Sequence, residues 1–377
     1  MDLALSKEQV MARELFRQFA EAEVKPLAQE IDETERFPRE TVEKLQKYGF
    51  MGIPYPREVG GQGCDTLTYI LCVEELSRVC GTTGVIVSSH TSLGCGPIMQ
   101  YGTQAQIEKY LVPLCRGEKL GAFALTEPSA GTDAGNQQTR AEKQGDHYIL
   151  NGSKIFITNG GQADVYIVFA MTDKSKGTRG ISAFIVEKDF PGFSIGTKEK
   201  KMGIRGSSTT ELIFENCIVP AENLLGQEGK GYSIAMATLD GGRIGIAAQA
   251  LGLAQGAFDE TVKYVKERKQ FGRPIMKFQN TQFALADMKT RIEAARLLVY
   301  RAALAKDTKK RFSEEAAMAK LFAAETAMEV TTKCVQLFGG YGYTREYPVE
   351  RMMRDAKITE IYEGTSEVQR MVIAGTL

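Results

Sequence analysis

The hydrophobic period of this chain changes twice, and these two changes constrain its fold more than any other feature. Up to about Gly121 the apolar residues recur at helical spacing, beginning with a capping-box pattern at Ser6 and Gln9. From there to about Gly229, short runs of alternating apolar residues lie between Gly, Pro, Asn and Asp. Long helical patterns return after Gly231. The order helix, strand, helix predicts an α+β fold.

These changes divide the chain into three predicted domains. They are an N-terminal helical domain, a middle antiparallel β-domain and a C-terminal helical bundle, over residues 1–121, 122–229 and 230–377. The long helices expected in the third domain cover residues 232–266, 281–305 and 313–338, with a last piece from residue 366. The third of these stretches is rich in Ala, which suits closely packed helices, so we predict a four-helix bundle.

Asn151-Gly152 is the strongest hairpin signal in the middle domain. Residues 148–150 and 154–157 flank it and have the pattern of strands, so we predict a tight turn between two antiparallel strands. Further strands are expected at residues 164–170, 181–187, 193–196 and 211–214.

Composition argues against several classes of function. Lys plus Arg and Asp plus Glu both number 47, so no overall charge attracts nucleic acid or anionic lipid. No apolar run approaches the roughly 20 residues of a membrane-spanning helix, and the N-terminal residues lack the apolar core of a signal peptide. The 7 cysteines include no CxxC pair. We therefore expect a cytoplasmic protein with reduced cysteines, no nucleic-acid partner and no membrane insertion.

Familiar catalytic and nucleotide-binding motifs are missing from the sequence. It contains only 2 histidines, His90 and His147, and no HExxH, so we expect no metal site. There is no GxSxG, no GxxxxGK[ST], and no GxGxxG after a predicted strand. Gly339-Gly340-Tyr341-Gly342 follows a helical run instead. A bound dinucleotide must therefore be held by another route.

Five motifs carry the most specific information in the chain. They are residues 125–133 (LTEPSAGTD), 151–159 (NGSKIFITN), 267–272 (ERKQFG), 336–343 (QLFGGYGY) and 361–367 (IYEGTSE). Each alone is a weak signal, but all five in this order and spacing are specific. Together they resemble the acyl-CoA dehydrogenase family over essentially the whole chain, closest to its bacterial short-chain type.

The resemblance implies FAD-dependent α,β-dehydrogenation of a short straight-chain acyl-CoA, with butyryl-CoA converted to crotonyl-CoA. Glu363 matches the family's base, which removes the α-proton while a hydride passes from the β carbon to flavin N5. The resemblance also implies an electron-transferring flavoprotein as electron acceptor, and a homotetramer. The chemistry fits a carboxylate, because a C–H group beside a thioester is a poor acid and needs a desolvated base of raised pKa. Donors to the thioester carbonyl, implied to be the Glu363 N–H and a flavin ribityl hydroxyl, complete the site.

The residues that the resemblance assigns to FAD fall in three groups. Those expected along the flavin ring are Phe123, Leu125, Thr126, Gly131, Thr132, Phe156, Ile157 and Thr158. Those expected at its other parts, in relatives partly across a subunit boundary, are Arg268, Phe271, Gln279, Gln336, Leu337, Phe338, Gly339 and Gly340. Thr365, Ser366 and Glu367 complete the set. FAD binding and assembly should then be linked. Phe156 departs from the family, where many relatives carry Trp, so a role for an indole N–H is lost.

The residues assigned to the acyl-CoA are Thr132, Asp240, Gly241, Gly242, Arg243, Tyr362 and Gly364. One branch of the family carries its catalytic Glu at the position of Gly242. Glycine at this position therefore favours straight short chains over isovaleryl-type substrates. From the residues alone, Asp240 and Arg243 could also be a simple helix ion pair.

Other functions and simpler structural roles remain open at this point. An acyl-CoA oxidase or flavin monooxygenase on the same fold would react with oxygen and form peroxide. A non-catalytic acyl-CoA-binding flavoprotein would need no base, so Glu363 argues against it. Structurally, Thr365 or Ser366 could be an ordinary helix N-cap, and Arg268 a solvated charge.

Overall fold

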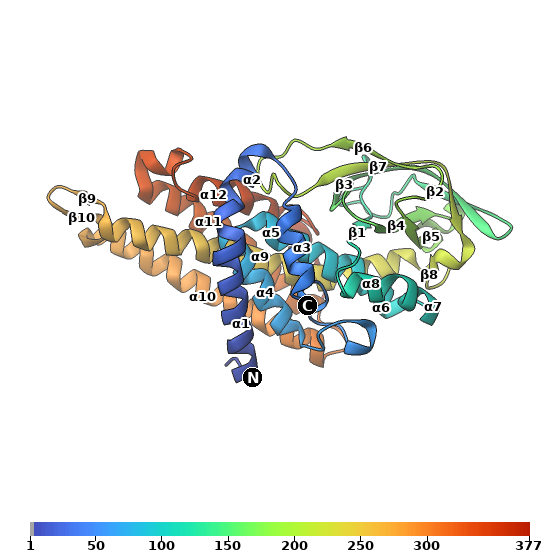
Figure 1. Ribbon diagram of the computed structural model, residues 1–377, viewed down its shortest axis with the longest axis horizontal. Helices are drawn as coiled ribbons and strands as arrows, with labels where there is room; N and C mark the ends of the chain where they lie inside the picture. Colours follow the sequence, from blue (N-terminus) through green and yellow to red (C-terminus); the bar gives the residue numbers. More distant parts are fainter. Residues whose placement is uncertain (1–3) are drawn as a thin grey trace.

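A sheet lies at one end of the molecule, and long helices run from beneath it to the opposite end (Figure 1). The computed structural model describes residues 4–377, and its elements follow the predicted order of helices, strands and helices. The mixed helix and sheet content confirms the predicted fold class.

Short helices form the first third of the chain. They are α1 (Lys7–Phe19), α2 (Ala28–Thr34), α3 (Arg39–Lys47), α4 (Thr66–Val79), α5 (Gly81–Ser88), α6 (Gly96–Tyr101), α7 (Gln104–Gln106) and α8 (Val112–Cys115). The predicted capping box of α1 is present, because the Ser6 side chain accepts from the Gln9 N–H and the Gln9 side chain accepts from the Ser6 N–H. Residues 81–101, which include the π-helical segment η5 (Ser89–Cys95), were not predicted as helical. Both α5 and η5 are buried along their whole length, so they show no one-sided apolar period.

The sheet is built from β1 (Gly121–Ala124), β2 (Arg140–Gln144), β3 (His147–Thr158), β4 (Val165–Met171), β5 (Ile181–Glu187), β6 (Phe193–Lys198), β7 (Thr209–Pro220) and β8 (Leu224–Leu225). Its strand order is β6-β7-β3-β2-β4-β5-β8, and β1 pairs with β4. Most pairs are antiparallel, as predicted. The pairs β1–β4 and β2–β4 are parallel, which corrects the purely antiparallel expectation. Each parallel pair is joined by a long crossover, as parallel pairing requires.

The hairpin predicted at Asn151-Gly152 is wrong. β3 continues through both residues, and its register with β7 shifts between Leu150 and Gly152. Gly152 has φ 142°, so the Asn-Gly pair forms a bulge inside one strand rather than a turn between two. The real hairpin joins β2 to β3 through Gly145 and Asp146, with Gln144 opposite His147. Gly145 has the positive φ, 62°, that such a two-residue turn needs.

Three long helices dominate the C-terminal region, as predicted. They are α9 (Gly231–Glu267), α10 (Gln279–Thr308) and α11 (Ser313–Phe338), followed by the short helices α12 (Val349–Lys357) and α13 (Ser366–Ala374). A small hairpin of β9 (Lys269–Gln270) and β10 (Arg273–Pro274) joins α9 to α10 at the end of the molecule opposite the sheet (Figure 1). The Ala-rich face of α11 is fully buried at residues Ala316, Ala319, Ala323, Ala324 and Ala327.

Helix α4 from the N-terminal region packs against α9 and so joins this helical core. The two helices approach closely because Gly252 and Gly256 on α9 face the backbone carbonyls of Glu74 and Arg78, where a Cβ would not fit. All seven cysteines are free, and all but Cys64 are buried. Among residues 4–377, no helix is both long enough and apolar enough to cross a membrane.

Candidate active site

Glu363 lies in a strained loop between the turn η11 (Ile358–Glu360) and α13. Glu363 has φ 53° and Gly364 has φ 92°, so two consecutive residues adopt the left-handed region. A glycine does so freely, whereas a glutamate does so at a cost, and such strain is concentrated at functional sites. The next residue, Thr365, caps α13 by accepting from the Val368 N–H at 3.3 Å, so the predicted N-cap is Thr365.

The Glu363 carboxylate lies against α9 at Gly242. A Cβ at Gly242 would overlap the Glu363 Oε2 atom and would lie 2.8 Å from the Leu93 Cδ2 atom of η5. Gly242 therefore leaves the space that the carboxylate occupies. This close approach joins two candidate residues that are far apart in the sequence, and it makes a side chain at position 242 incompatible with the present position of Glu363.

The electrostatic surroundings of Glu363 suit a base. Its Oε2 atom is buried and has no hydrogen-bond partner. Burial raises the pKa of Glu363 to about 7, while the charges of Lys320 and Arg243 oppose this rise. A carboxylate with a pKa near neutrality is well matched to accept a proton at physiological pH.

Replacing Gly242 with Ala is expected to slow substrate oxidation by about 10²-fold, because the new methyl group would push the Glu363 carboxylate out of position. The rate of flavin bleaching after mixing with butyryl-CoA under nitrogen measures this effect. Gly96→Ala on α6 is the matched control, since the nearest atom to its added Cβ is the Tyr55 hydroxyl oxygen at 3.8 Å. Equal rates for the Gly242→Ala protein and the unaltered protein would contradict this arrangement.

Asp240 and Arg243 form the ion pair that their spacing allowed, with 2.5 Å between Asp240 Oδ1 and an Arg243 terminal nitrogen. The Ser313 hydroxyl donates a second hydrogen bond to Asp240. The Arg243 side chain is 7% exposed, and its Nε atom is buried without a partner. The pair therefore lies beside Glu363 with one donor still unused. Gly241 lies between the two residues on the same helix.

Tyr362 is held by a chain of hydrogen bonds. Its hydroxyl donates to the Gln249 side chain of α9, and Gln249 donates to the Gly81 carbonyl oxygen at 3.0 Å. These two hydrogen bonds hold Tyr362, the residue before Glu363, in place. Sequence reasoning missed Gln249, because a single glutamine within the apolar face of a helix has no motif to mark it.

The two segments expected along the flavin ring lie side by side. The Ile155 N–H donates to the Thr126 carbonyl oxygen at 2.9 Å, which places β3 beside the segment that follows β1. Phe156 has φ 57° and is 58% exposed, whereas Ile157 is buried in the sheet core and Thr158 is half-buried. Phe123 and Leu125 are buried beneath this edge.

Several candidate residues of this edge are open to solvent. Gly131 and Thr132 are exposed, and a Cβ on Gly131 would meet no atom within 4 Å. Phe156 of the neighbouring strand β3 is exposed as well. These residues fit a flavin ring.

A second group of candidate residues lies around another cavity, whose lining includes Arg268 and residues 336–340. Phe338 stacks on Tyr264 with 4.0 Å between ring centroids, and the Arg268 guanidinium lies 5.4 Å from the Tyr341 ring centroid. Gln279 does not line this cavity, and Phe271, at the tip of the β9–β10 hairpin, is 94% exposed. The Phe271 ring lies edge-on to that of Phe278, with 6.1 Å between their centroids.

The second group is remote from Glu363 within one chain. Gly242 and Tyr264 are 22 residues apart on α9, which corresponds to about 33 Å along the helix axis. The remaining candidates, Ser366 and Glu367, lie on α13 beside the Glu363 loop, the first buried and the second exposed. The candidate residues therefore form two separate groups on each chain.

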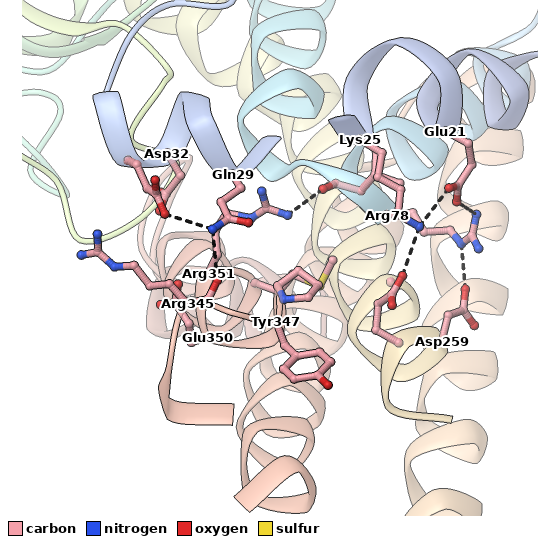
Figure 2. Close-up of a pocket in the computed structure, with 16 residues that line it drawn as sticks. Glu21, Lys25, Gln29, Asp32, Arg78, Asp259, Arg345, Tyr347, Glu350 and Arg351 are labelled. Atoms are coloured by element: carbon pink, nitrogen blue, oxygen red, sulfur yellow. Dashed lines mark hydrogen bonds and ion pairs between the residues drawn. The ribbon is translucent and has the colours of Figure 1, made fainter. Parts of the chain in front are cut away.

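A charged pocket between the N-terminal helices, α9 and α12 contains none of the predicted site residues (Figure 2). Arg78 pairs there with Glu21 at 3.3 Å and with Asp259 at 2.7 Å. Lys25 pairs with Glu21 and with Glu260. These ion pairs connect residues 21–25, helix α4 and helix α9. Throughout residues 4–377, no group of three or more His, Cys, Asp or Glu side chains is placed to hold a metal ion.

Family models match the chain in three consecutive parts. The N-terminal domain of acyl-CoA dehydrogenase matches residues 6–118, the middle domain residues 122–217, and the C-terminal domain residues 229–377. The short-chain specific acyl-CoA dehydrogenase of Clostridium acetobutylicum is 65% identical over 377 residues, which is 100% of both chains.

Two solved structures share the fold at high identity. Butyryl-CoA dehydrogenase from Megasphaera elsdenii superposes with a TM-score of 0.98 and 56% identity, covering 100% of this chain and 99% of the other. A chain from a study of the electron transferring flavoprotein of Acidaminococcus fermentans and flavin-based electron bifurcation has a TM-score of 0.99 and 58% identity. It covers 100% of this chain and 99% of its own.

Proposed function

The chain belongs to the acyl-CoA dehydrogenase family, and we propose that Glu363 is the base with which it oxidises a short straight-chain acyl-CoA. The activity is that of a short-chain acyl-CoA dehydrogenase, whose electrons pass to an electron-transferring flavoprotein. The observation that supports this role of Glu363 is its desolvated carboxylate, held against Gly242 with no hydrogen-bond partner.

Glu363 takes the α-proton of the thioester, and a hydride leaves the β carbon, so that butyryl-CoA becomes crotonyl-CoA. FAD, when bound, supplies the hydride acceptor. The Glu363 N–H donates to the thioester carbonyl oxygen, where negative charge develops as the proton leaves. We propose that Arg243, whose buried Nε donor has no partner, and Asp240, its ion-pair partner, contact the CoA portion, and that Gly241, Tyr362, Gly364 and Thr132 also contact the acyl-CoA.

We propose FAD as the cofactor, with its flavin ring on the edge formed by Phe123, Leu125, Thr126, Gly131, Phe156, Ile157 and Thr158, near residues 365–367. Its pyrophosphate and adenosine would be held by the second group, Arg268 and residues 336–340, together with Phe271 and Gln279 from outside the lining of that cavity. Because the two groups are about 33 Å apart along α9, different subunits would supply them to one FAD. A homotetramer therefore fits the distribution of these residues. Seven free cysteines fit a reducing location, so we propose the cytoplasm.

The purified protein is expected to bind FAD, and its flavin is expected to bleach when butyryl-CoA is added under nitrogen. The electrons of the reduced flavin are then expected to pass to an added electron-transferring flavoprotein, so that the yellow colour of the enzyme returns. An aerobic assay separates the alternatives, because an oxidase would form peroxide rapidly when butyryl-CoA is added in air. A protein that stays colourless after reconstitution with FAD, or that never bleaches, would contradict the proposed function.

A further inference from the structure

Lys320 is a fully buried lysine in the middle of α11. Its neighbours three and four residues away on the same face of the helix are all alanines, Ala316, Ala317, Ala323 and Ala324, and its side chain extends toward the Glu363 loop. Its ammonium group donates to the Gly364 carbonyl oxygen at 2.7 Å. Burying an ammonium group is costly unless it is hydrogen-bonded and paired with an opposite charge. Lys320 has the hydrogen bond, but it forms no ion pair within the described residues.

The hydrogen bond from Lys320 fixes the orientation of the strained loop. The Gln369 side chain of α13 donates to the same Gly364 carbonyl oxygen at 2.9 Å and to the Glu363 carbonyl oxygen at 3.3 Å. Two donors, one from α11 and one from α13, therefore hold the backbone of this loop. The Glu363 carboxylate itself lies against Gly242 of α9.

The charges around this loop make Lys320 the dominant cation near Glu363. Arg243 on α9 also acts on Glu363, but it is paired with Asp240. Of the other acids that act on Lys320, Glu360 in η11 pairs with Lys357 at 2.6 Å, and Glu367 on α13 is exposed to solvent. Burial lowers the pKa of Lys320 to about 8, and the charge of Glu363 opposes this shift.

We propose that Lys320 is a positioning residue for the oxidation step: its ammonium holds the Gly364 carbonyl, so that the loop presents Glu363 to the substrate, and places an unpaired positive charge behind that carboxylate. This inference rests on the proposed function of Glu363. It assigns to Lys320, in the middle of α11, a role that none of the five motifs indicated.

The test is the pH dependence of anaerobic bleaching by butyryl-CoA in the FAD-loaded protein. The unaltered protein is expected to bleach faster as the pH rises through about 7, because Glu363 must be deprotonated to act. Lys320→Met and Lys320→Gln remove the positive charge, and its loss favours the protonated form of the Glu363 carboxyl. Both should move this rise to higher pH by about one unit. Lys320→Arg keeps the charge and should keep the rise near its original pH.

A second readout does not depend on turnover. Infrared difference spectra between each Lys320 variant and the same variant with Glu363→Gln report the protonated Glu363 carboxyl directly, and its titration should move by the same amount. Lys47→Met on α3 removes an exposed lysine far from the loop and serves as the control.

Unchanged pH profiles and titrations in both Lys320→Met and Lys320→Gln would overturn this inference. If Lys320→Met does not fold, Lys320→Gln decides by the same criterion. If the unaltered protein fails to bleach at any pH, the proposed function is what fails.

Discussion

Glu363→Gln is expected to lower the rate of flavin bleaching by butyryl-CoA by about 10⁴-fold or more. Glutamine has nearly the same shape, so it should fill the space beside Gly242 and leave the loop intact. It has no basic oxygen, however, and cannot take the α-proton. The variant should therefore keep its yellow colour and still bind the acyl-CoA. Stopped-flow absorbance measures the rate, and the spectral change on titration with substrate measures binding.

Glu325→Gln is the matched control for this experiment. Glu325 is exposed on α11 and pairs with Arg370 of α13 at 2.5 Å, so the change removes a carboxylate from the same region without touching the loop. Its bleaching rate should equal that of the unaltered protein. Normal bleaching in Glu363→Gln would show that another group removes the proton. Asp240, the candidate carboxylate that pairs with Arg243, would then be replaced next.

The long helices could be predicted from the sequence because each has one buried face or a face made of small residues such as alanine. Two other features could not be predicted, because packing rather than local pattern decides them. The segment of α5 and η5, residues 81–95, is buried on all sides and shows no period. Asn151-Gly152 has a turn sequence, yet pairing with β7 on one side keeps it inside a strand, where its flexibility forms a bulge.

The candidate site illustrates the same limit. The motif around residues 361–367 marked Glu363, and the glycine at position 242 was noted as the alternative position for a base. Only the structure shows that these two positions compete for one space. Lys320 and Gln249 were missed, because each is a single polar residue on a helix and acts through a partner far away in the sequence. A lone lysine on an alanine-rich face was the one available signal for Lys320.

Lys154→Met is expected to destabilise the protein by about 3–5 kcal/mol, because the change breaks a buried ion pair. The Lys154 side chain is 0% exposed and that of Glu127 is 2% exposed, with 2.7 Å between their charged atoms. Removing the lysine leaves the Glu127 carboxylate buried without its counter-charge. The Leu125 carbonyl and the Gln137 side chain each lose the same donor. Denaturant unfolding, monitored by circular dichroism, measures the change in the free energy of unfolding.

Lys188→Met provides a control of the same bond length, because Lys188 pairs with Asp164 at 2.7 Å but is 52% exposed. That exposed pair should contribute only about 0–1 kcal/mol, since water screens it. If burial of an unpaired charge is the cause, adding Glu127→Gln to Lys154→Met should recover part of the loss. The Gln138 and Thr139 N–H groups now bind different oxygens of the carboxylate, so the single amide oxygen would keep one of these two hydrogen bonds, and the recovery should be partial. Equal losses for Lys154→Met and Lys188→Met would instead mean that the buried pair stabilises the sheet no more than a surface contact. The segment from Leu125 to Gly131, which we expect to lie along the flavin, would then owe its position to backbone pairing alone.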